Sequence, residues 1–178
     1  LPTDLLRKTT DPKKRKELKE LLPYVTFSGI FSSRANDRLI ERSNYFCADL
    51  DHVGGLKEIN DVEKTIGDNY NPAMSFVSPS GDGVKVVFLI DPEAGNHLVF
   101  FHSIKNFIKQ KTGREIDDQC KDISRACFLC HDPLVVTSDP GLLDQGFLNK
   151  YLPKPDPLIN VGDTINQKMS NPSFSKSI

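Results

Sequence analysis

Two aspartates at the end of an apolar segment are the sharpest chemical feature of the sequence. Asp49 and Asp51 close the run YFCADLD at residues 45–51. Because alternate side chains of a strand point to opposite faces, the two carboxylates would share one face. They would repel each other and cost free energy to bury, and a divalent cation between them relieves both penalties. The pair therefore predicts a Mg²⁺ or Mn²⁺ site, with a strand running into a polar turn as the alternative.

A glycine-containing turn is the second feature. The segment SPSGDGVK at residues 78–85 places Gly81 and Gly83 two positions apart, just before Lys85. Glycines let the backbone approach a ligand, and free amides in such a turn form an anion-binding concavity. The segment lacks the spacing and the Lys-Ser/Thr ending of a P-loop. It predicts either a phosphate cradle with Lys85 as a point charge, or a plain hairpin turn with a surface lysine.

A third group of charges lies in IDDQCKDISR at residues 116–125. Asp117 or Asp118 could complete a three-carboxylate metal site, and Arg125 could hold a phosphate through paired donors. The alternative is a charged loop in which Asp122 and Arg125 form a local ion pair. Together, the acidic pair, the cationic turn, the third acid and the arginine fit phosphoryl transfer with two metals.

Length and composition limit the class of protein to which these residues belong. The chain has 178 residues, 38% of them hydrophobic and 26% charged, which fits one domain or two intimately packed subdomains. The net charge of −1 does not by itself indicate nucleic-acid binding. No apolar run approaches the roughly 18 residues of a membrane span, and no signal sequence opens the chain. We therefore expect a cytoplasmic protein with reduced cysteines, and its start at Leu1 suggests a piece of a longer chain.

Hydrophobic periodicity predicts an α+β domain over residues 1–151. The order of elements indicates a mixed sheet with helices on one or both faces. Residues 152–178 are rich in Pro, Asn and Ser and are predicted to form a linker or tail. The expected elements are a helix over 4–22 that breaks near Asp11, strands over 24–31 and 45–51, a helix over 55–66, strands over 73–78 and 84–90, a helix over 94–111, and a last core strand over 123–130.

Other cysteines and histidines are weaker candidates. Cys127–His131 reads CFLCH, which matches c-type haem attachment, but that modification needs an exported chain. Zinc ligation together with Cys120 is disfavoured because a strand would place the two cysteines of this segment on opposite faces. His97 and His102 are five apart, off the spacing of a helical zinc pair, so we expect packing or surface roles. His52 could touch a nucleotide or the metal site, or serve only in a turn.

The three charged segments resemble, in order and spacing, the motifs of the archaeo-eukaryotic primase (primase-polymerase) superfamily. The resemblance is strongest to the primase-like N-terminal domain of virulence-associated E proteins. It is carried by FCADLDHV, SPSGDGVKVVF and IDDQCKDISRACFLCHDP within residues 46–133. It implies a core related to the RNA-recognition fold, with packed helices and a small N-terminal αβ unit. It also implies template-directed joining of nucleoside triphosphates on a single-stranded template and primer, with a helicase-like domain elsewhere in the full-length protein.

The resemblance also assigns roles to individual residues. Many relatives have histidine where this chain has Lys85, which keeps a cation but loses a group that titrates near neutral pH. A catalytically silent nucleic-acid-binding module and a metal-dependent nuclease remain as alternative functions. The implied catalytic metal ligands are Asp49, Asp51 and Asp117, with Asp118 and Asp122 as possible substitutes for the third, and the implied nucleotide-binding residues are Ser78, Ser80, Gly81, Gly83, Lys85 and Arg125.

Overall fold

A five-stranded sheet forms the centre of the protein, whose computed structural model describes residues 2–153. The central strand β6 pairs antiparallel with β4 on one side and with β5 on the other. β8 extends the sheet beyond β5, and β9 runs parallel to the far end of β6. The strands are β4 (Tyr45–Leu50), β5 (Met74–Val77), β6 (Val84–Ile90), β8 (Val136–Thr137) and β9 (Leu142–Leu143).

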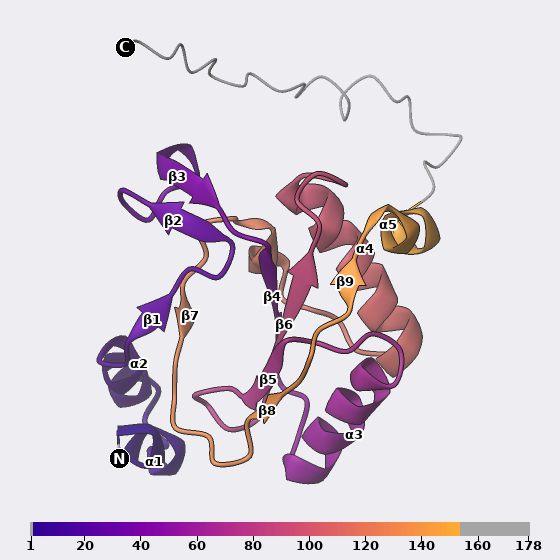
Figure 1. The fold of residues 1–178 in the computed structure, drawn as a ribbon. Coiled ribbons are helices and arrows are strands. Elements are labelled where there is room, and N and C mark those ends of the chain that lie inside the picture. The colour runs from indigo at the N-terminus through magenta and orange to yellow at the C-terminus, as the bar shows by residue number, and fades with distance from the viewer. Residues whose placement is uncertain (1, 154–178) are drawn as a thin grey trace, which may run out of the picture.

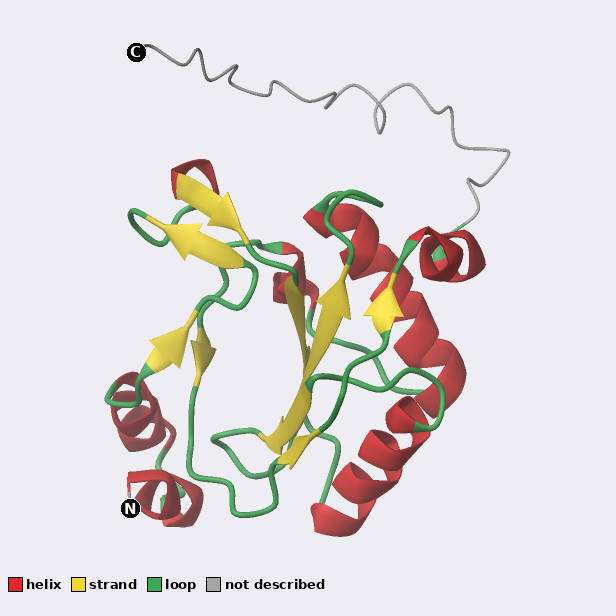
Figure 2. Cartoon of the chain, viewed as in Figure 1, coloured by secondary structure: helices red, strands yellow, loops and turns green. Residues whose placement is uncertain are grey.

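Three helices cover one face of this sheet: α3 (Leu56–Gly67), α4 (His97–Thr112) and α5 (Gln145–Tyr151) (Figures 1 and 2). Asn96 caps α4 by accepting a hydrogen bond from the Val99 amide. The helices and alternate residues of the strands form the main core, in which aromatic rings are prominent. Its fully buried large side chains include Phe46, Phe88, Phe100, Phe107 and Phe147.

The other sheet face meets a smaller unit made of short elements (Figure 1). Asp11 accepts a hydrogen bond from the Lys13 amide, and this cap separates the first two helices. A second, smaller apolar cluster joins β1 and β7 to Phe76 and Val87 of the sheet. The unit contains α1 (Pro2–Lys8), α2 (Pro12–Glu20), β1 (Tyr24–Val25) paired with β7 (Cys127–Phe128), and β2 (Gly29–Phe31) paired with β3 (Leu39–Arg42).

The α+β class is confirmed, together with the break at Asp11 and the elements between residues 45 and 112. The core strand predicted over 123–130 is wrong, because only Cys127–Phe128 is extended and it pairs with β1 outside the central sheet. The strand predicted over 24–31 is divided between β1 and β2. β3, β8, β9 and α5 were not predicted from the sequence. The predicted tail at 152–178 lies almost wholly outside the described residues.

Within the described range, the helices are too short or too polar to cross a bilayer.

Candidate metal centre and basic groove

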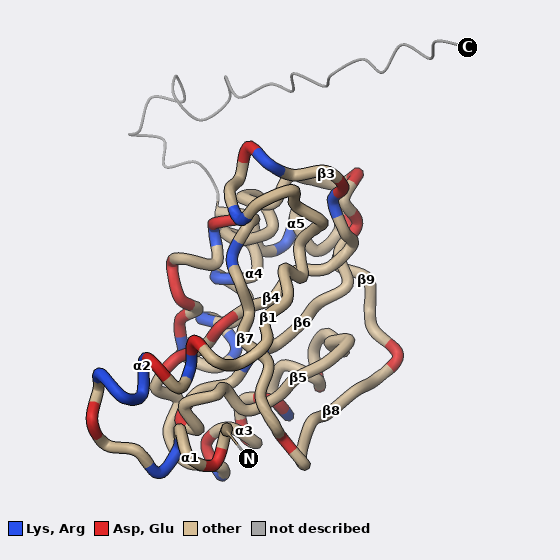
Figure 3. Tube along the Cα trace, turned by 90° about the vertical axis from the view of Figure 1, so that its left-hand side faces the viewer, with Lys and Arg blue, Asp and Glu red and all other residues tan. Residues whose placement is uncertain are grey.

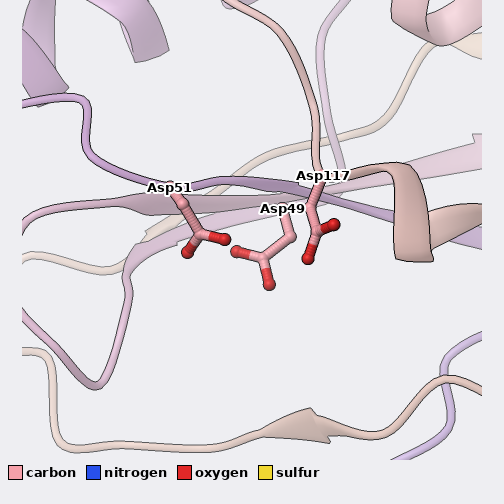
Figure 4. A group of neighbouring side chains, drawn as sticks. All are labelled: Asp49, Asp51 and Asp117. Carbon is pink, nitrogen blue, oxygen red and sulfur yellow. The ribbon is translucent and has the colours of Figure 1, made fainter. Parts of the chain in front are cut away.

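The end of β4 positions three carboxylates on the sheet face away from the main helices. Asp49 lies on β4 directly opposite Lys85 of β6, and Asp51 follows the last residue of the strand. Asp117, far along the chain, is held here because its amide donates a 2.8 Å hydrogen bond to the Asp49 carbonyl. Figure 4 shows the three side chains next to one another, with Asp49 in the middle. The shared strand face predicted for Asp49 and Asp51 is therefore present in the structure.

These three aspartates form the acidic triad. One carboxylate oxygen from each lies within 4.8 Å of the other two. Asp49 is only 6% exposed, and its Oδ1 has no hydrogen-bond partner. A buried carboxylate oxygen without a partner is costly, and a divalent cation would supply the missing interaction. The residues present therefore fit a hard cation such as Mg²⁺ or Mn²⁺, for which carboxylate oxygens are the preferred ligands.

Two cations hold the other oxygen of Asp49. The Lys85 ammonium and the Arg125 guanidinium both donate to Asp49 Oδ2, Arg125 from 3.1 Å. The same Arg125 nitrogen donates to Asp117 Oδ2 at 2.6 Å, and the second one donates to Gln119 at 2.8 Å. Arg125 therefore fixes two members of the acidic triad, while Asp49 Oδ1 is left buried without a hydrogen-bond partner.

Burial and neighbouring charges shift the pKa values of Asp49 and Asp51 in opposite directions. Burial opposes ionisation of Asp49, but the neighbouring Lys85 and Arg125 outweigh it and lower its pKa. Burial, followed by the negative charge of Asp49, raises the pKa of Asp51. A cation bound between the two carboxylates would relieve the repulsion that raises the pKa of Asp51.

Only Asp117 among the three candidates for the third acid lies in the triad. Asp118 is exposed and forms an ion pair with Lys105. Asp122 accepts hydrogen bonds from the amide and the hydroxyl of Ser124, each at 2.9 Å. The two possible substitutes therefore have local partners of their own.

The glycine-containing turn is built for packing against β4. The Gly81 amide donates to the Ser78 carbonyl at 2.9 Å, and the Ser78 amide donates to the Gly83 carbonyl at 2.8 Å. A Cβ at Gly83 would lie 2.5 Å from the Leu50 carbonyl oxygen, so only glycine fits there without a shift. On the outside of the turn, Arg7 donates to the Ser78 carbonyl at 3.1 Å. Gly81 has a φ of +88°, a conformation that favours glycine, and the close approach at Gly83 excludes a side chain, so both glycines are explained without a ligand.

A groove of about 520 Å³ opens beside Asp49. None of the predicted turn residues from Ser78 to Gly83 lines it, whereas Lys85 and Arg125 do. Sequence reasoning missed its other cations, which come from α2, from the loop between β2 and β3, and from the short 3₁₀ helix Asp118–Lys121. The cationic side chains that line the groove are Lys19, Arg34, Lys85, Lys121 and Arg125.

The remaining cysteines and histidines form no second metal centre in the described part of the chain, where the acidic triad is the only candidate cluster. His97 is buried and stacks on Phe46, with ring centroids 4.9 Å apart. His52 is exposed and contacts Asp82, with 2.9 Å between Nδ1 and Oδ2. The packing role expected for His97 is confirmed, and His52 lies in the loop that joins β4 to α3.

The fold and the site define an α+β domain with an acidic cluster at a sheet edge, next to a cationic groove. The sequence model of the family described as "BT4734-like, N-terminal domain" matches residues 17–136, more than half of the chain. The chain therefore belongs to the BT4734-like N-terminal domain family. Neither the curated proteins nor the solved structures yield a significant match.

Proposed function

We propose that this domain is a template-directed nucleotidyltransferase of the primase-polymerase type, which joins nucleotides at a 3′-hydroxyl with two divalent metals. One observation carries the proposal: the unpartnered Oδ1 of buried Asp49 lies in a triad of carboxylates only 4.8 Å across. Such a cluster is costly without a cation and well suited to one. The resemblance of the three charged segments to primase motifs supplies the reaction class.

The residues of the site would have two roles, metal ligation and phosphate binding. Asp49, Asp51 and Asp117 would hold Mg²⁺ or Mn²⁺, which would supply polarisation of the α-phosphate and activation of the attacking 3′-hydroxyl. Arg125 orients Asp49 and Asp117 through its ion pairs. Lys85 and Arg125 would also neutralise negative charge on the incoming triphosphate and on the pyrophosphate that leaves.

Primer extension on a single-stranded template with Mn²⁺ or Mg²⁺ tests this function. We expect extension by the wild type and a loss on the order of a hundredfold or more in Asp51→Asn and Asp117→Asn, because each removes a metal ligand. Asp61→Asn is the control, since Asp61 is exposed on α3 and pairs only with Lys57. Absence of metal-dependent extension by the wild type would refute the function, and a shortened primer would point to a nuclease.

A second candidate is a silent nucleic-acid-binding module on the same fold. The observation that favours it is the pair of cations on Asp49, because Lys85 and Arg125 already neutralise the charge that a metal would offset. A silent module would bind single-stranded DNA without any dependence on Mn²⁺. Equal DNA binding by the wild type and Asp51→Asn, with no extension by either, would select this alternative.

A further inference from the structure

Three cations line the groove in addition to Lys85 and Arg125, the two that form ion pairs with the acidic triad. Lys19, Arg34 and Lys121 come from three separate elements and line the same cavity. None of them forms an ion pair with a carboxylate in the part of the chain that the structure describes. By contrast, Lys57 and Lys64 each pair with an aspartate one helical turn ahead. The three groove cations therefore keep their charges available to a ligand.

The position of Lys19 is set by an aromatic ring. Its ammonium lies 5.8 Å from the ring centroid of Phe128, which also lines the groove. Phe128 is in turn held by an edge-on contact with Tyr24, at 6.0 Å between centroids. A cation over an aromatic face is attracted by the ring quadrupole. This contact keeps Lys19 at the wall of the groove.

The size and charge of the groove point to one class of ligand. Five cationic side chains outnumber the two carboxylates, Asp49 and Asp122, on its walls. Its volume of about 520 Å³ falls within the roughly 300–1,000 Å³ of small-molecule sites. A compact polyanion fits this combination better than an extended strand, which needs a basic track rather than a pocket. The turn at 78–83 does not reach the groove, so it cannot be the main phosphate contact there.

We propose that Lys19, Arg34 and Lys121 bind the polyphosphate chain of a nucleotide and hold it against the acidic triad. This assignment moves phosphate recognition from the glycine-containing turn to three side chains from α2, the β2–β3 loop and the 3₁₀ helix. The identification of the ligand as a nucleotide rests on the proposed function, whereas the three cationic side chains by themselves indicate a site for polyphosphate. Figure 3 shows that Lys and Arg positions follow one another along α2, and the exposed Lys14 of this helix provides a matched control.

Calorimetric titration with inorganic tripolyphosphate, in the presence of a chelator, tests the assignment. We expect binding by the wild type and an affinity roughly tenfold lower in Arg34→Ala and in Lys121→Ala, because each loses a charged contact to phosphate. Both residues are exposed, so the variants should fold. Lys14→Ala, which removes an exposed charge of α2 outside the groove, should bind as the wild type does. Ser80→Ala should also be unchanged.

Several results would overturn the assignment. Wild-type affinity in the Arg34→Ala/Lys121→Ala double variant would do so, as would a loss in Ser80→Ala that equals the loss in the groove variants. Binding of a single-stranded oligonucleotide without binding of tripolyphosphate would make the groove a strand site instead. Because the titration contains no metal, it is separate from catalysis: tripolyphosphate binding without primer extension would refute the proposed function and support this inference. Extension that is unaffected in the double variant would refute the inference alone.

Discussion

Asp49 is the residue on which the proposed metal chemistry depends most. One of its carboxylate oxygens is bound by Lys85 and Arg125, and the other is buried without a partner. The two oxygens of this carboxylate therefore differ: Oδ2 is fixed by two cations, and Oδ1 has no hydrogen-bond partner. A site that positions a ligand must hold its ligating groups in place, and the ion pairs do this for Asp49.

The ion pair between Lys85 and Asp49 should be essential for stability. Both side chains are buried, at 7% and 8% exposure. We expect Lys85→Met to lower the free energy of unfolding by about 3 kcal/mol, because it leaves a buried carboxylate with less compensation. Urea denaturation measures this change. Lys57→Met is the matched control, since its pair with Asp61 is exposed and should be worth less than about 1 kcal/mol. Equal losses in the two variants would contradict the structure.

His97 should make stability depend on pH. Burial, aided by the positive charge of Arg42, lowers its pKa. Its Nε2 must donate to the Cys120 carbonyl, 2.9 Å away, because a carbonyl only accepts. The unfolded chain therefore takes up a proton at higher pH than the folded protein. Stability is complete above the unfolded pKa of about 6.5 and falls as the pH drops below it toward the lower folded pKa.

Denaturation series at pH 7.5 and pH 5.5 would measure this loss. We expect His97→Gln to show a smaller difference in unfolding free energy between the two pH values than the wild type. His131→Gln is the control, since His131 is exposed. A pH dependence that is unchanged in His97→Gln would contradict the role given to burial of this imidazole.

At this scale the sequence predicted the acids better than the cations. Asp49 and Asp51 lie two residues apart at the end of one strand, so alternation alone placed them on one face, and the structure brings Asp117 to them through a backbone hydrogen bond. Lys19, Arg34 and Lys121 share no element, and only the tertiary fold brings them together. The metal-binding role of the acids and the phosphate-binding role of the cations stay predictions.

At the scale of elements, the junction of β4 and β6 shows why the turn contains glycine. Gly83→Ala would bring a Cβ within 2.5 Å of the Leu50 carbonyl. We expect a loss of about 1–3 kcal/mol in unfolding free energy, the usual effect of overpacking. Gly67→Ala is the matched control, because a Cβ there meets nothing within 4 Å, and a helical position favours alanine over glycine by up to about 1 kcal/mol. A stable Gly83→Ala variant would contradict the close approach.

Apolar patterning explains the most accurate predictions. The elements α3, α4, β4 and β6 carry clear apolar patterns and were predicted within a few residues of their bounds. β7, β8 and β9 have two residues each, too few for any period to be read. The apolar run 123–130 was misread because its residues pack in a loop beside the small cluster around Phe76 and do not extend the sheet.

At the scale of the whole molecule, the central sheet separates the main core from the candidate functional site. One face carries the main core with α3, α4 and α5, and the other carries the acidic triad and the groove. The smaller unit with α1, α2, β1 and β7 lies across this second face and supplies Lys19 to the groove (Figure 1). The groove is therefore lined by segments that lie far apart in the sequence, from α2 to β7.

Asp51 of the acidic triad should reduce the stability of the fold when no metal is bound. Burial and Asp49 raise the pKa of Asp51, which means that its charged form is disfavoured in the fold. In chelator at neutral pH, we expect Asp51→Asn to raise the free energy of unfolding by a few tenths of a kcal/mol, the order of exposed charge interactions. Thermal unfolding measures the change. A clear loss of stability in Asp51→Asn would mean that this carboxylate has a structural partner.

Binding of Mn²⁺ to the protein, measured by electron paramagnetic resonance of the free ion, tests the central claim most directly. The acidic triad should bind Mn²⁺ in the wild type and in Asp61→Asn, and binding should fall at least tenfold in Asp51→Asn and in Asp117→Asn. Equal Mn²⁺ binding by all four proteins, or no binding by the wild type, would contradict a metal centre at Asp49, Asp51 and Asp117.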